Sequence, residues 1–383
     1  MRSLGIDPGT GSFDLVVLDD GRVVYEESVD TAAVAAQPEL LIGAIERAGE
    51  VDVIGGPSGY GVPVTRNDEI LDPWRFALEV LLLTREGDLR AGSGELGMKV
   101  YEALAKVVVE LWRRRLPVLY IPSAVLLPTI PPHRKVNRLD MGTADKVAVA
   151  ALGVVDQATR LGLDYEDVSF ILVELGLGYT AVIAVDRGLI VDGMGGTMAP
   201  IGFLAAGAID AELAVMGREW SRSDVFHGGV SDVCGSLDLD EALRRYEEGA
   251  QPCAAAVEAL LEGVVKAVRA MTATLPNPRE VLLSGRLSRH PKLSRLVRER
   301  LERIAPVAQV RGLPGARLAK EAAQGYAVIA DGLAGGPFKG LVEHMRIPDA
   351  RGTVLDWAFH PRLRGARERL RSVYAEVVAR PRL

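Results

Sequence analysis

The fold is decided by two stretches of this 383-residue sequence, Gly5-Ile6-Asp7-Pro8-Gly9-Thr10-Gly11-Ser12 and Val173-Glu174-Leu175-Gly176-Leu177-Gly178-Tyr179-Thr180. In each stretch a short apolar run ends at an acidic residue, and a turn that contains two glycines follows. Each stretch leads into a second apolar run that ends at a hairpin signal, Asp20-Gly21 or Asp186-Arg187-Gly188. The same strand, turn, strand, hairpin, strand pattern therefore occurs twice, about 165 positions apart, and it predicts two similar domains.

The first meander is predicted at Ser3–Ile6, Phe13–Leu18 and Arg22–Ser28, and the second within residues 166–193. Further strands are expected at Asp52–Gly55, Leu116–Ile121, Glu280–Leu283 and Val307–Val310. Apolar periodicity predicts helices at Pro38–Ala48, Glu95–Arg115, Asp140–Leu161, Leu239–Glu248, Cys253–Thr274, Pro291–Ile304, Ala316–Ala334 and Pro361–Arg380. Alternating strands and helices indicate an α/β fold of two lobes with mixed sheets, followed by a helical tail that packs on the body through an apolar stripe.

Composition excludes several classes of protein. Hydrophobic residues make up 48% of the chain and charged residues 25%, which is typical of a globular protein with full cores. The net charge of −6 argues against a nucleic-acid partner, because such a surface needs a basic excess. The longest apolar stretch, Ser169–Val185, contains Glu174 and two glycines, so it is interpreted as two strands rather than a membrane span.

The cysteines and the start of the chain indicate the compartment. Cys234 and Cys253 are the only cysteines, with no CxxC spacing and no nearby pair of histidines, so a zinc site is not expected. We interpret them as two buried thiols in a reducing cytosol. No signal peptide precedes the strand that contains Leu4, and the protein is predicted to be cytoplasmic.

The first glycine turn has the chemistry of a phosphate site. Gly9 and Gly11 let backbone amides approach a ligand, and successive N–H groups in such a turn favour an anion. Thr10 and Ser12 add hydroxyl donors, and Asp7 is placed to hold a hydrated Mg²⁺ beside phosphate oxygens. The alternative is an ordinary glycine hairpin with a capping aspartate. The segment is neither a Walker A motif nor a Rossmann fingerprint.

The second turn repeats this logic, with Glu174 in the place of Asp7 and with Gly176, Gly178, Tyr179 and Thr180 around the phosphates. A third segment, Ser284-Gly285-Arg286, follows a buried strand. A backbone loop of this kind packs against a purine, with the arginine stacking on it or reaching a phosphate.

Three such segments in this order resemble the phosphate-1, phosphate-2 and adenosine motifs of the acetate and sugar kinase, Hsp70 and actin superfamily. The resemblance covers about residues 1–335. It implies two ribonuclease-H-like lobes, ATP and Mg²⁺ in the cleft between them, and a hinge that closes on substrate. We accordingly expect an N-terminal lobe at 1–150, a nucleotide-binding lobe at 151–335 and a helical extension at 336–383.

Within that superfamily, the second half is most similar to the acyl kinases, butyrate kinase in particular, and to an uncharacterised archaeal family of predicted kinases. The similarity lies in Glu174–Asp192 and in the Gly-rich stretch Gly193–Pro200. The sequence departs from the acyl kinases in having Asp7 where they usually carry Asn and Glu174 where they usually carry His or Asp. It also lacks an arginine at the strand end Ile54-Gly55-Gly56, where Arg66 is the nearest candidate.

Other polar residues are candidates for the acceptor side. Asp140 or Asp145 is predicted to act there as base or Mg²⁺ ligand, with Lys146 on a phosphate, although Asp140 also fits a helix N-cap. Ser58 and Tyr60 follow a strand end, where ligands bind in α/β folds. His227 and His133 are weaker candidates, since a lone histidine is more often structural.

The sequence thus predicts ATP- and Mg²⁺-dependent phosphoryl transfer to a small acceptor, with a carboxylate favoured. Asp7 and Glu174 would serve the metal, while the nucleoside would be held by Gly195, Gly196, Ser284, Gly285 and Arg286. The resemblance to acyl kinases also implies a homodimer. Two alternatives stay open: a nucleotide-gated binding protein in the manner of Hsp70 or actin, without a small acceptor, and a scaffold that binds no nucleotide.

Overall fold

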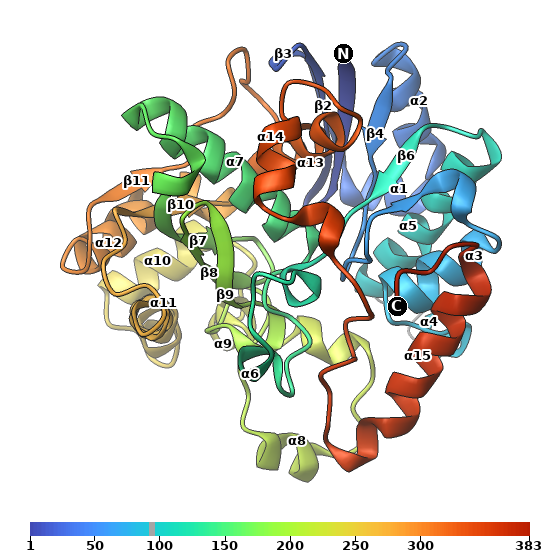
Figure 1. Cartoon of the computed structure of the whole chain (residues 1–383). Helices are drawn as coiled ribbons and strands as arrows, with labels where there is room; N and C mark the ends of the chain where they lie inside the picture. The colour runs from blue at the N-terminus through green and yellow to red at the C-terminus, as the bar shows by residue number, and fades with distance from the viewer. Residues whose placement is uncertain (92–95) are drawn as a thin grey trace.

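The computed structural model describes residues 1–91 and 96–383 and contains two mixed β-sheets with helices around them (Figure 1). The first sheet is formed by β1 (Arg2–Pro8), β2 (Ser12–Asp19), β3 (Arg22–Asp30), β4 (Val53–Gly55), β5 (Thr65–Arg66) and β6 (Val118–Tyr120). The second is formed by β7 (Ser169–Leu175), β8 (Thr180–Asp186), β9 (Leu189–Met194), β10 (Glu280–Ser284) and β11 (Val307–Gln309).

The two sheets share one strand order. The first runs β3-β2-β1-β4-β6-β5, and the second, read from its own meander, runs β9-β8-β7-β10-β11. In each, the central strand pairs antiparallel with its hairpin partner and parallel with the strand that follows the crossover. The internal repeat and the two-lobed α/β fold predicted from the sequence are confirmed.

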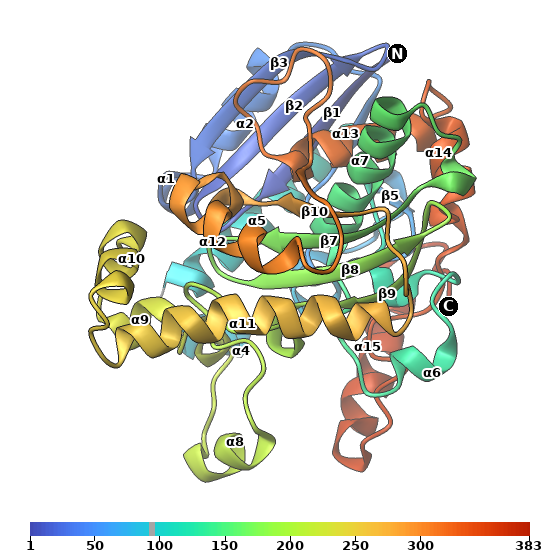
Figure 2. The ribbon, with the colours of Figure 1, turned by 90° about the vertical axis from the view of Figure 1, so that its left-hand side faces the viewer.

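The helices are α1 (Thr31–Ala36), α2 (Glu39–Arg47), α3 (Pro73–Arg75), α4 (Glu86–Ala91), α5 (Leu96–Arg113), α6 (Pro132–Lys135), α7 (Ala144–Leu161), α8 (Ala211–Gly217), α9 (Val230–Cys234), α10 (Leu239–Glu247), α11 (Cys253–Thr272), α12 (Pro291–Leu301), α13 (Glu321–Leu333), α14 (Lys339–His344) and α15 (Arg364–Val377). The predicted start of α5 at Glu95 lies outside the described residues. Helix α8, in the long segment between β9 and α9, was not predicted, and it projects from the body in both ribbon views (Figures 1 and 2).

Strand β7 is buried on both faces and divides the core. Phe170 and Leu172 point into the cluster that contains α7, α13 and the first sheet. Ile171 and Val173 point into a second cluster, where α11 lies along the sheet (Figure 2). A strand buried on both sides needs a continuous apolar run, which explains the sequence Ser-Phe-Ile-Leu-Val-Glu-Leu.

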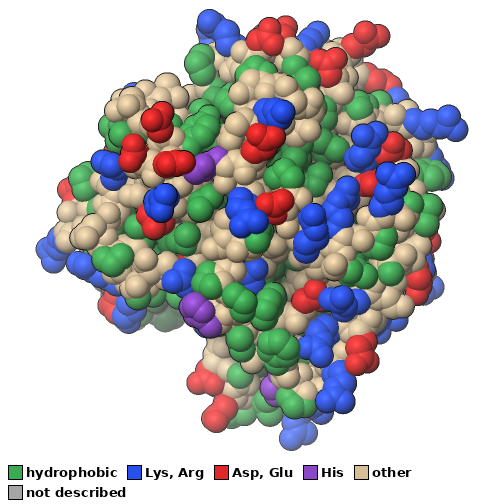
Figure 3. All heavy atoms as spheres, viewed as in Figure 1, with side chains coloured by type: hydrophobic (Ala, Val, Ile, Leu, Met, Phe, Trp, Pro, Cys, Tyr) green, Lys and Arg blue, Asp and Glu red, His purple; other side chains and the backbone are tan. Residues whose placement is uncertain are grey.

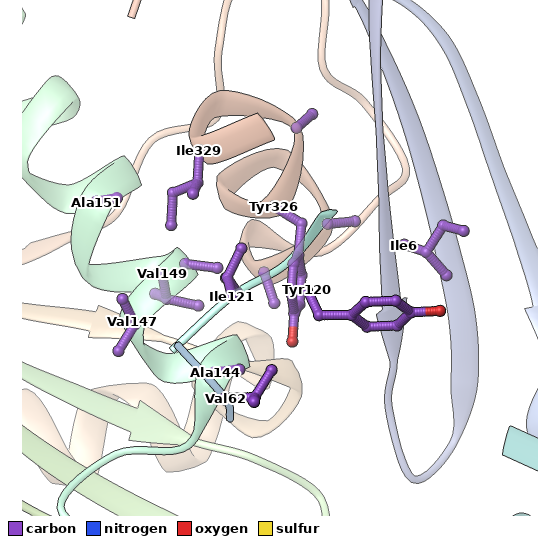
Figure 4. Close-up of a cluster of buried hydrophobic side chains, with 14 of the residues drawn as sticks. Ile6, Val62, Tyr120, Ile121, Ala144, Val147, Val149, Ala151, Tyr326 and Ile329 are labelled. Atoms are coloured by element: carbon purple, nitrogen blue, oxygen red, sulfur yellow. The ribbon is translucent and has the colours of Figure 1, made fainter. Parts of the chain in front are cut away.

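Helix α13 packs against β1, β4 and α7. Its Tyr326 and Ile329 lie in a cluster of buried side chains that also contains Val147 of α7 (Figure 4). A Cβ added at Gly5 of β1 would lie 2.0 Å from the carbonyl oxygen of Ala323. A Cβ at Gly55 of β4 would lie 2.5 Å from the carbonyl oxygen of Tyr326. On the other side of the helix, a Cβ at Gly325 would lie 2.0 Å from the carbonyl oxygen of Ala148 in α7. Glycine at these positions permits backbone-to-backbone packing on two sides of one helix.

The C-terminal tail returns to the first half of the chain. Helix α15 buries Leu370, Val373, Tyr374 and Val377, and it packs against the π-helix Phe76–Leu81. Residue Val378 then forms a β-bridge with Ile70. The predicted apolar stripe of the last helix is confirmed.

Three sequence predictions were wrong. Helix α7 begins at Ala144 rather than Asp140, and α13 begins at Glu321 rather than Ala316. The two cysteines are not separate thiols: Cys234 ends α9 and Cys253 begins α11, the two helices pack together, and a disulfide joins the residues with their Cα atoms 4.5 Å apart. Spacing along the chain did not show that these helix ends meet.

On the face shown in Figure 3, acidic and basic side chains are interspersed. Many arginines pair with carboxylates on their own helix, as Arg244 does with Glu241 at 2.8 Å. No helix in residues 1–91 or 96–383 combines the length and the apolar character that crossing a membrane requires.

The seat of α13 can be tested with Gly325→Ala. The added methyl group would clash with the backbone of Ala148, which cannot move aside as a side chain can. We therefore expect the free energy of unfolding to fall by about 3 kcal/mol. Thermal or urea denaturation measures this loss. The matched control is Gly340→Ala in α14, where the new Cβ meets open space and better helix propensity adds up to about 1 kcal/mol. Equal midpoints for the two variants would contradict the close packing of α13.

Candidate functional site

The two glycine turns meet at one cavity of about 280 Å³. The first joins β1 to β2 and the second joins β7 to β8, so both lie at the carboxyl ends of the central strands of their sheets. A Cβ on Gly178 would lie 3.3 Å from the hydroxyl oxygen of Thr10, and a Cβ on Gly11 would lie 3.5 Å from the side chain of Leu177. The structure therefore brings together two turns that are far apart in the sequence.

The two turns have the same internal hydrogen bonding. The N–H of Gly9 donates to the carbonyl of Ser12, and the N–H of Gly176 donates to the carbonyl of Tyr179, both at 3.1 Å. In the first turn, the carbonyls of Gly9 and Gly11 accept from Thr31 of α1. Within the described residues, the amides of Thr10 and Gly11, and those of Leu177 and Gly178, have no hydrogen-bond acceptor. Pairs of free N–H groups in a turn are the arrangement that attracts an anion.

The third predicted segment reaches the same place. A Cβ on Gly11 would lie 1.9 Å from a terminal nitrogen of Arg286, so the guanidinium lies directly on the first turn. Arg286 lines the cavity. Ser284 does not line it, but its hydroxyl donates to the carboxylate of Glu174 and ties β10 to β7. Gly285 and Ser12 do not line the cavity either.

Asp7 lies at the end of β1 beside Lys320, the residue that precedes α13. The ammonium of Lys320 is 3.4 Å from Asp7, 3.3 Å from Asp14 and 3.0 Å from the carbonyl oxygen of Ser12. Burial raises the pKa of Asp7 to about 6, although Lys320 opposes the shift. Burial lowers the pKa of Lys320, but its two carboxylates outweigh that effect and the net shift is upward.

Glu174 has a lysine of its own, which comes from α7. Lys146 lies 3.9 Å from Glu174 and forms an ion pair with Asp145, which also accepts from the hydroxyl of Thr143. Burial raises the pKa of Glu174. Burial also acts to raise the pKa of Asp145, but Lys146 outweighs it and the net shift is downward. Lys146 is held charged, because its carboxylates outweigh its burial and raise its pKa.

Asp140 lies before α7 and is not its N-cap, which is Thr143. Instead, the Asp140 carboxylate accepts from the N–H of Gly142 at 2.8 Å and packs against Gly195 and Gly196, whose added Cβ atoms would lie 2.3 and 2.6 Å from it. Burial raises the pKa of Asp140 to about 6. The N-cap interpretation was wrong because the loop Asp140–Thr143 adds a tight turn ahead of the helix.

The sequence analysis predicted that Gly195 and Gly196 hold the nucleoside together with the Ser284 segment. In the structure these two glycines contact Asp140 instead, at some distance from that segment. They follow β9, three strands along the sheet from β10, so a separation of about 14 Å is expected. The predicted residues that line the cavity are Asp7, Gly9, Thr10, Gly11, Asp140, Asp145, Lys146, Glu174, Gly176, Gly178, Tyr179, Thr180, Gly195, Gly196 and Arg286.

Several weaker candidates lie elsewhere. His227 and His133 are exposed and do not line the cavity, and Arg66 points outward to Asp68 at 2.9 Å. Ser58 is buried between the carbonyl of Gly56 and the N–H of Ile121, a structural role. Tyr60 does line the cavity.

Sequence reasoning missed Lys320, Arg222 and Tyr101, which all line the cavity. Lys320 carried a weak signal, because it directly precedes an Ala-rich helix that begins with Glu321. Arg222 lies in the long segment after β9, and Tyr101 lies on α5. Nothing in their local sequence distinguishes them from surface residues.

The site residues fit Mg²⁺ held jointly with phosphate better than a metal caged by protein alone. In the described parts of the chain, no three His, Cys, Asp or Glu side chains gather closely enough to form a metal cage. Mg²⁺ commonly uses one or two carboxylates and takes its other ligands from phosphate and water. Asp7 and Glu174 each stand beside a turn with free amides, which matches that requirement.

Comparison with solved structures identifies the fold. A propionate kinase from Francisella tularensis subsp. tularensis SCHU S4 aligns with a TM-score of 0.57 at 12% identity, over 85% of this chain and 98% of that one. An acetate kinase from Entamoeba histolytica aligns with a TM-score of 0.53 at 13% identity, over 79% of this chain and 86% of that one. An acetate kinase from Porphyromonas gingivalis aligns with a TM-score of 0.52 at 15% identity, over 83% of this chain and 92% of that one. This chain therefore has the two-lobed fold of these acetate and propionate kinases.

A family model described as "Protein of unknown function (DUF1464)" matches residues 5–360. The chain belongs to this family. The matched range includes both glycine turns, the Ser284 segment, Lys320 and the segment that carries Arg222.

The raised pKa of Asp140 predicts how stability depends on pH. Between about pH 4 and pH 6 the native state keeps a proton that the unfolded chain releases, so this group lowers stability as the pH rises through that interval. Asp140→Asn removes the effect while keeping an acceptor for Gly142. Relative to wild type, we expect the variant to gain stability between pH 4 and 6 and to hold a constant gain of at most about 3 kcal/mol above pH 6.

Urea denaturation at a series of pH values measures this difference. Glu166→Gln, at an exposed position, is the control and should leave the pH profile unchanged. A flat difference curve for Asp140→Asn would show that Asp140 is ordinarily solvated.

Proposed function

We propose that this protein is an ATP- and Mg²⁺-dependent phosphotransferase that acts on a small-molecule acceptor, with a carboxylate as the favoured acceptor group. The observation that carries the proposal is the meeting of two equivalent turns with free amides, one from each sheet, on either side of a cavity that also contains Arg286 and five acidic side chains. The similarity of the fold to acetate and propionate kinases supports it.

The nucleotide would lie with its phosphates between the two turns. The amides of Thr10, Gly11, Leu177 and Gly178 would donate to phosphate oxygens, and Arg286 would add positive charge at the first turn. Asp7 and Glu174 would hold Mg²⁺, which neutralises phosphate charge when bound. The Ser284 segment would contact the nucleoside.

The acceptor would enter beside Asp140, Gly195 and Gly196. Lys146 is half-buried and held charged by its carboxylates, and it would draw the transferring group toward this side. Asp145, itself held by the hydroxyl of Thr143, keeps the ammonium in place. Asp140 would orient the acceptor. Closure of the two halves would exclude water and so suppress hydrolysis of ATP.

A second function, a nucleotide-gated binding protein without an acceptor, is favoured by one observation. The first-half arginine nearest the acyl-kinase position, Arg66, is exposed and paired with Asp68 outside the cavity. If no other cation replaced it, nucleotide would change the orientation of the halves without phosphorylating a small acid.

Nucleotide binding is tested by thermal shift. ADP or ATP with Mg²⁺ at about 100 times the dissociation constant should stabilise the protein by about 2.7 kcal/mol. Gly11→Ala should abolish most of the shift, because its methyl group displaces Arg286 from the first turn. Gly87→Ala, where the methyl group meets open space, should keep the shift. If wild type shows none, the protein binds no nucleotide.

Phosphoryl transfer is tested by ADP formation with and without added carboxylic acids. A kinase should release ADP faster when its acceptor is present, and Asp7→Asn should reduce turnover by about 100-fold or more. Asp20→Asn, an exposed aspartate in the first hairpin, is the control and should keep full activity. A slow rate that no acid changes would support the nucleotide-gated protein instead.

A further inference from the structure

Arg222 lines the cavity and has no carboxylate partner in the described residues. It lies at the start of the short helical turn Ser223–Phe226, in the segment between β9 and α9. Its side chain reaches across to the first half of the chain, where one terminal nitrogen donates to the hydroxyl of Tyr60 at 2.7 Å and lies 3.5 Å from the hydroxyl of Tyr101.

The guanidinium has more donors than the protein uses. Among residues 1–91 and 96–383, only that terminal nitrogen has hydrogen-bond partners, namely the two phenols and, at 3.4 Å, the carbonyl oxygen of Leu82. The Nε of Arg222 is buried and has no partner in the same described part of the chain. Burying a cation whose N–H donors have no acceptors costs free energy unless an anion binds to them. A planar carboxylate suits this role, because its two oxygens can accept two parallel hydrogen bonds from one guanidinium.

Aromatic rings form the wall around this cation. The guanidinium carbon lies 5.1 Å from the ring centre of Tyr60 and 5.8 Å from that of Tyr101. Phe226 packs edge-on against Tyr101 and Tyr179 with ring centres 5.7 and 6.0 Å apart, and the hydroxyl of Tyr179 donates to the carbonyl of Val225 at 2.6 Å. These contacts fix the rings in place.

Aliphatic side chains complete the lining on this side of the cavity. Leu82, Val100 and Leu104 belong to it, and Leu82 and Leu104 are buried. An acidic molecule with only a methyl tail would leave most of this apolar surface uncovered. An aromatic ring or a branched aliphatic chain would cover it and would pack against the edges of the four rings.

We propose that Arg222 anchors the carboxylate of the acceptor, and that the pocket of Tyr60, Tyr101, Tyr179 and Phe226 selects acids with an aromatic or bulky apolar body. This inference rests on the proposed function, because it concerns the acceptor side of the same cavity. The resemblance to acyl kinases places an arginine at the strand end that corresponds to Gly55 and Gly56. Arg222, which comes from the second half of the chain and lines the cavity, would take the place of that arginine.

Contacts distinguish Arg222 from Arg286. Arg286 lies on the first glycine turn, whereas the hydrogen bonds of Arg222 in the described residues go to Tyr60, Leu82 and Tyr101, none of which belongs to a turn with free amides. The assignment therefore gives Arg286 to the nucleotide phosphates and Arg222 to the acceptor.

Calorimetric titration of the full chain, saturated with Mg²⁺ and ADP, tests the inference. Phenylacetate should bind about 10- to 100-fold more tightly than acetate, since its ring is buried in the pocket. Arg222→Gln should weaken phenylacetate binding about tenfold or more and leave ADP affinity within about twofold. Arg218→Gln, an exposed arginine of the same segment, is the matched control and should change neither affinity.

Equal affinities for acetate and phenylacetate, or no binding of either acid, would overturn the selectivity. Unchanged phenylacetate affinity in Arg222→Gln, or a loss of ADP affinity instead, would overturn the role of Arg222. Binding is measured without turnover, so the inference and the proposed function fail separately. If phenylacetate binds through Arg222 and ATP is never consumed with it, the acid subsite stands and phosphoryl transfer is refuted.

Discussion

The structure depends on the contact of one helix backbone with three neighbours. Helix α13 approaches β1 and β4 through Gly5 and Gly55, and it approaches α7 through its own Gly325. Gly5 and Gly55 are paired in register, so they form one flat strip across two strands. Because α13 is fixed on two sides, its first residues are fixed as well, and Lys320 is delivered to the end of β1 beside Asp7.

The same packing arranges the buried charges. Each acid at the end of a central strand faces a lysine from one of the two central helices: Asp7 faces Lys320, which precedes α13, and Glu174 faces Lys146 of α7. Each lysine also contacts a second carboxylate, Asp14 or Asp145. The protein thus keeps strongly charged groups close to the two turns while limiting the cost of burying them, and polyphosphate with a divalent cation is the ligand chemistry that suits this balance.

Local sequence was sufficient to predict both meanders, both glycine turns and most helices, because hairpin signals and apolar periodicity are local properties. It was also sufficient to group Asp7, Glu174 and the turn glycines, since the same pattern occurs twice. It failed where the outcome depends on long-range packing. The meeting of Cys234 with Cys253 follows from the docking of α9 on α11. The turn at Asp140 depends on Gly195 and Gly196, and the place of Arg222 depends on a long segment without periodicity.

The strip formed by Gly5 and Gly55 also has a consequence for biosynthesis. It lies near the start of the chain, yet the helix that covers it ends at Leu333. The first sheet is therefore synthesised long before α13 leaves the ribosome. Until α13 packs on it, the strip of Gly5 and Gly55 exposes its backbone to solvent, because glycine has no side chain to cover it. Nascent chains of this protein should accordingly rely on chaperones, and the first sheet should acquire its final order only after α13 has been synthesised.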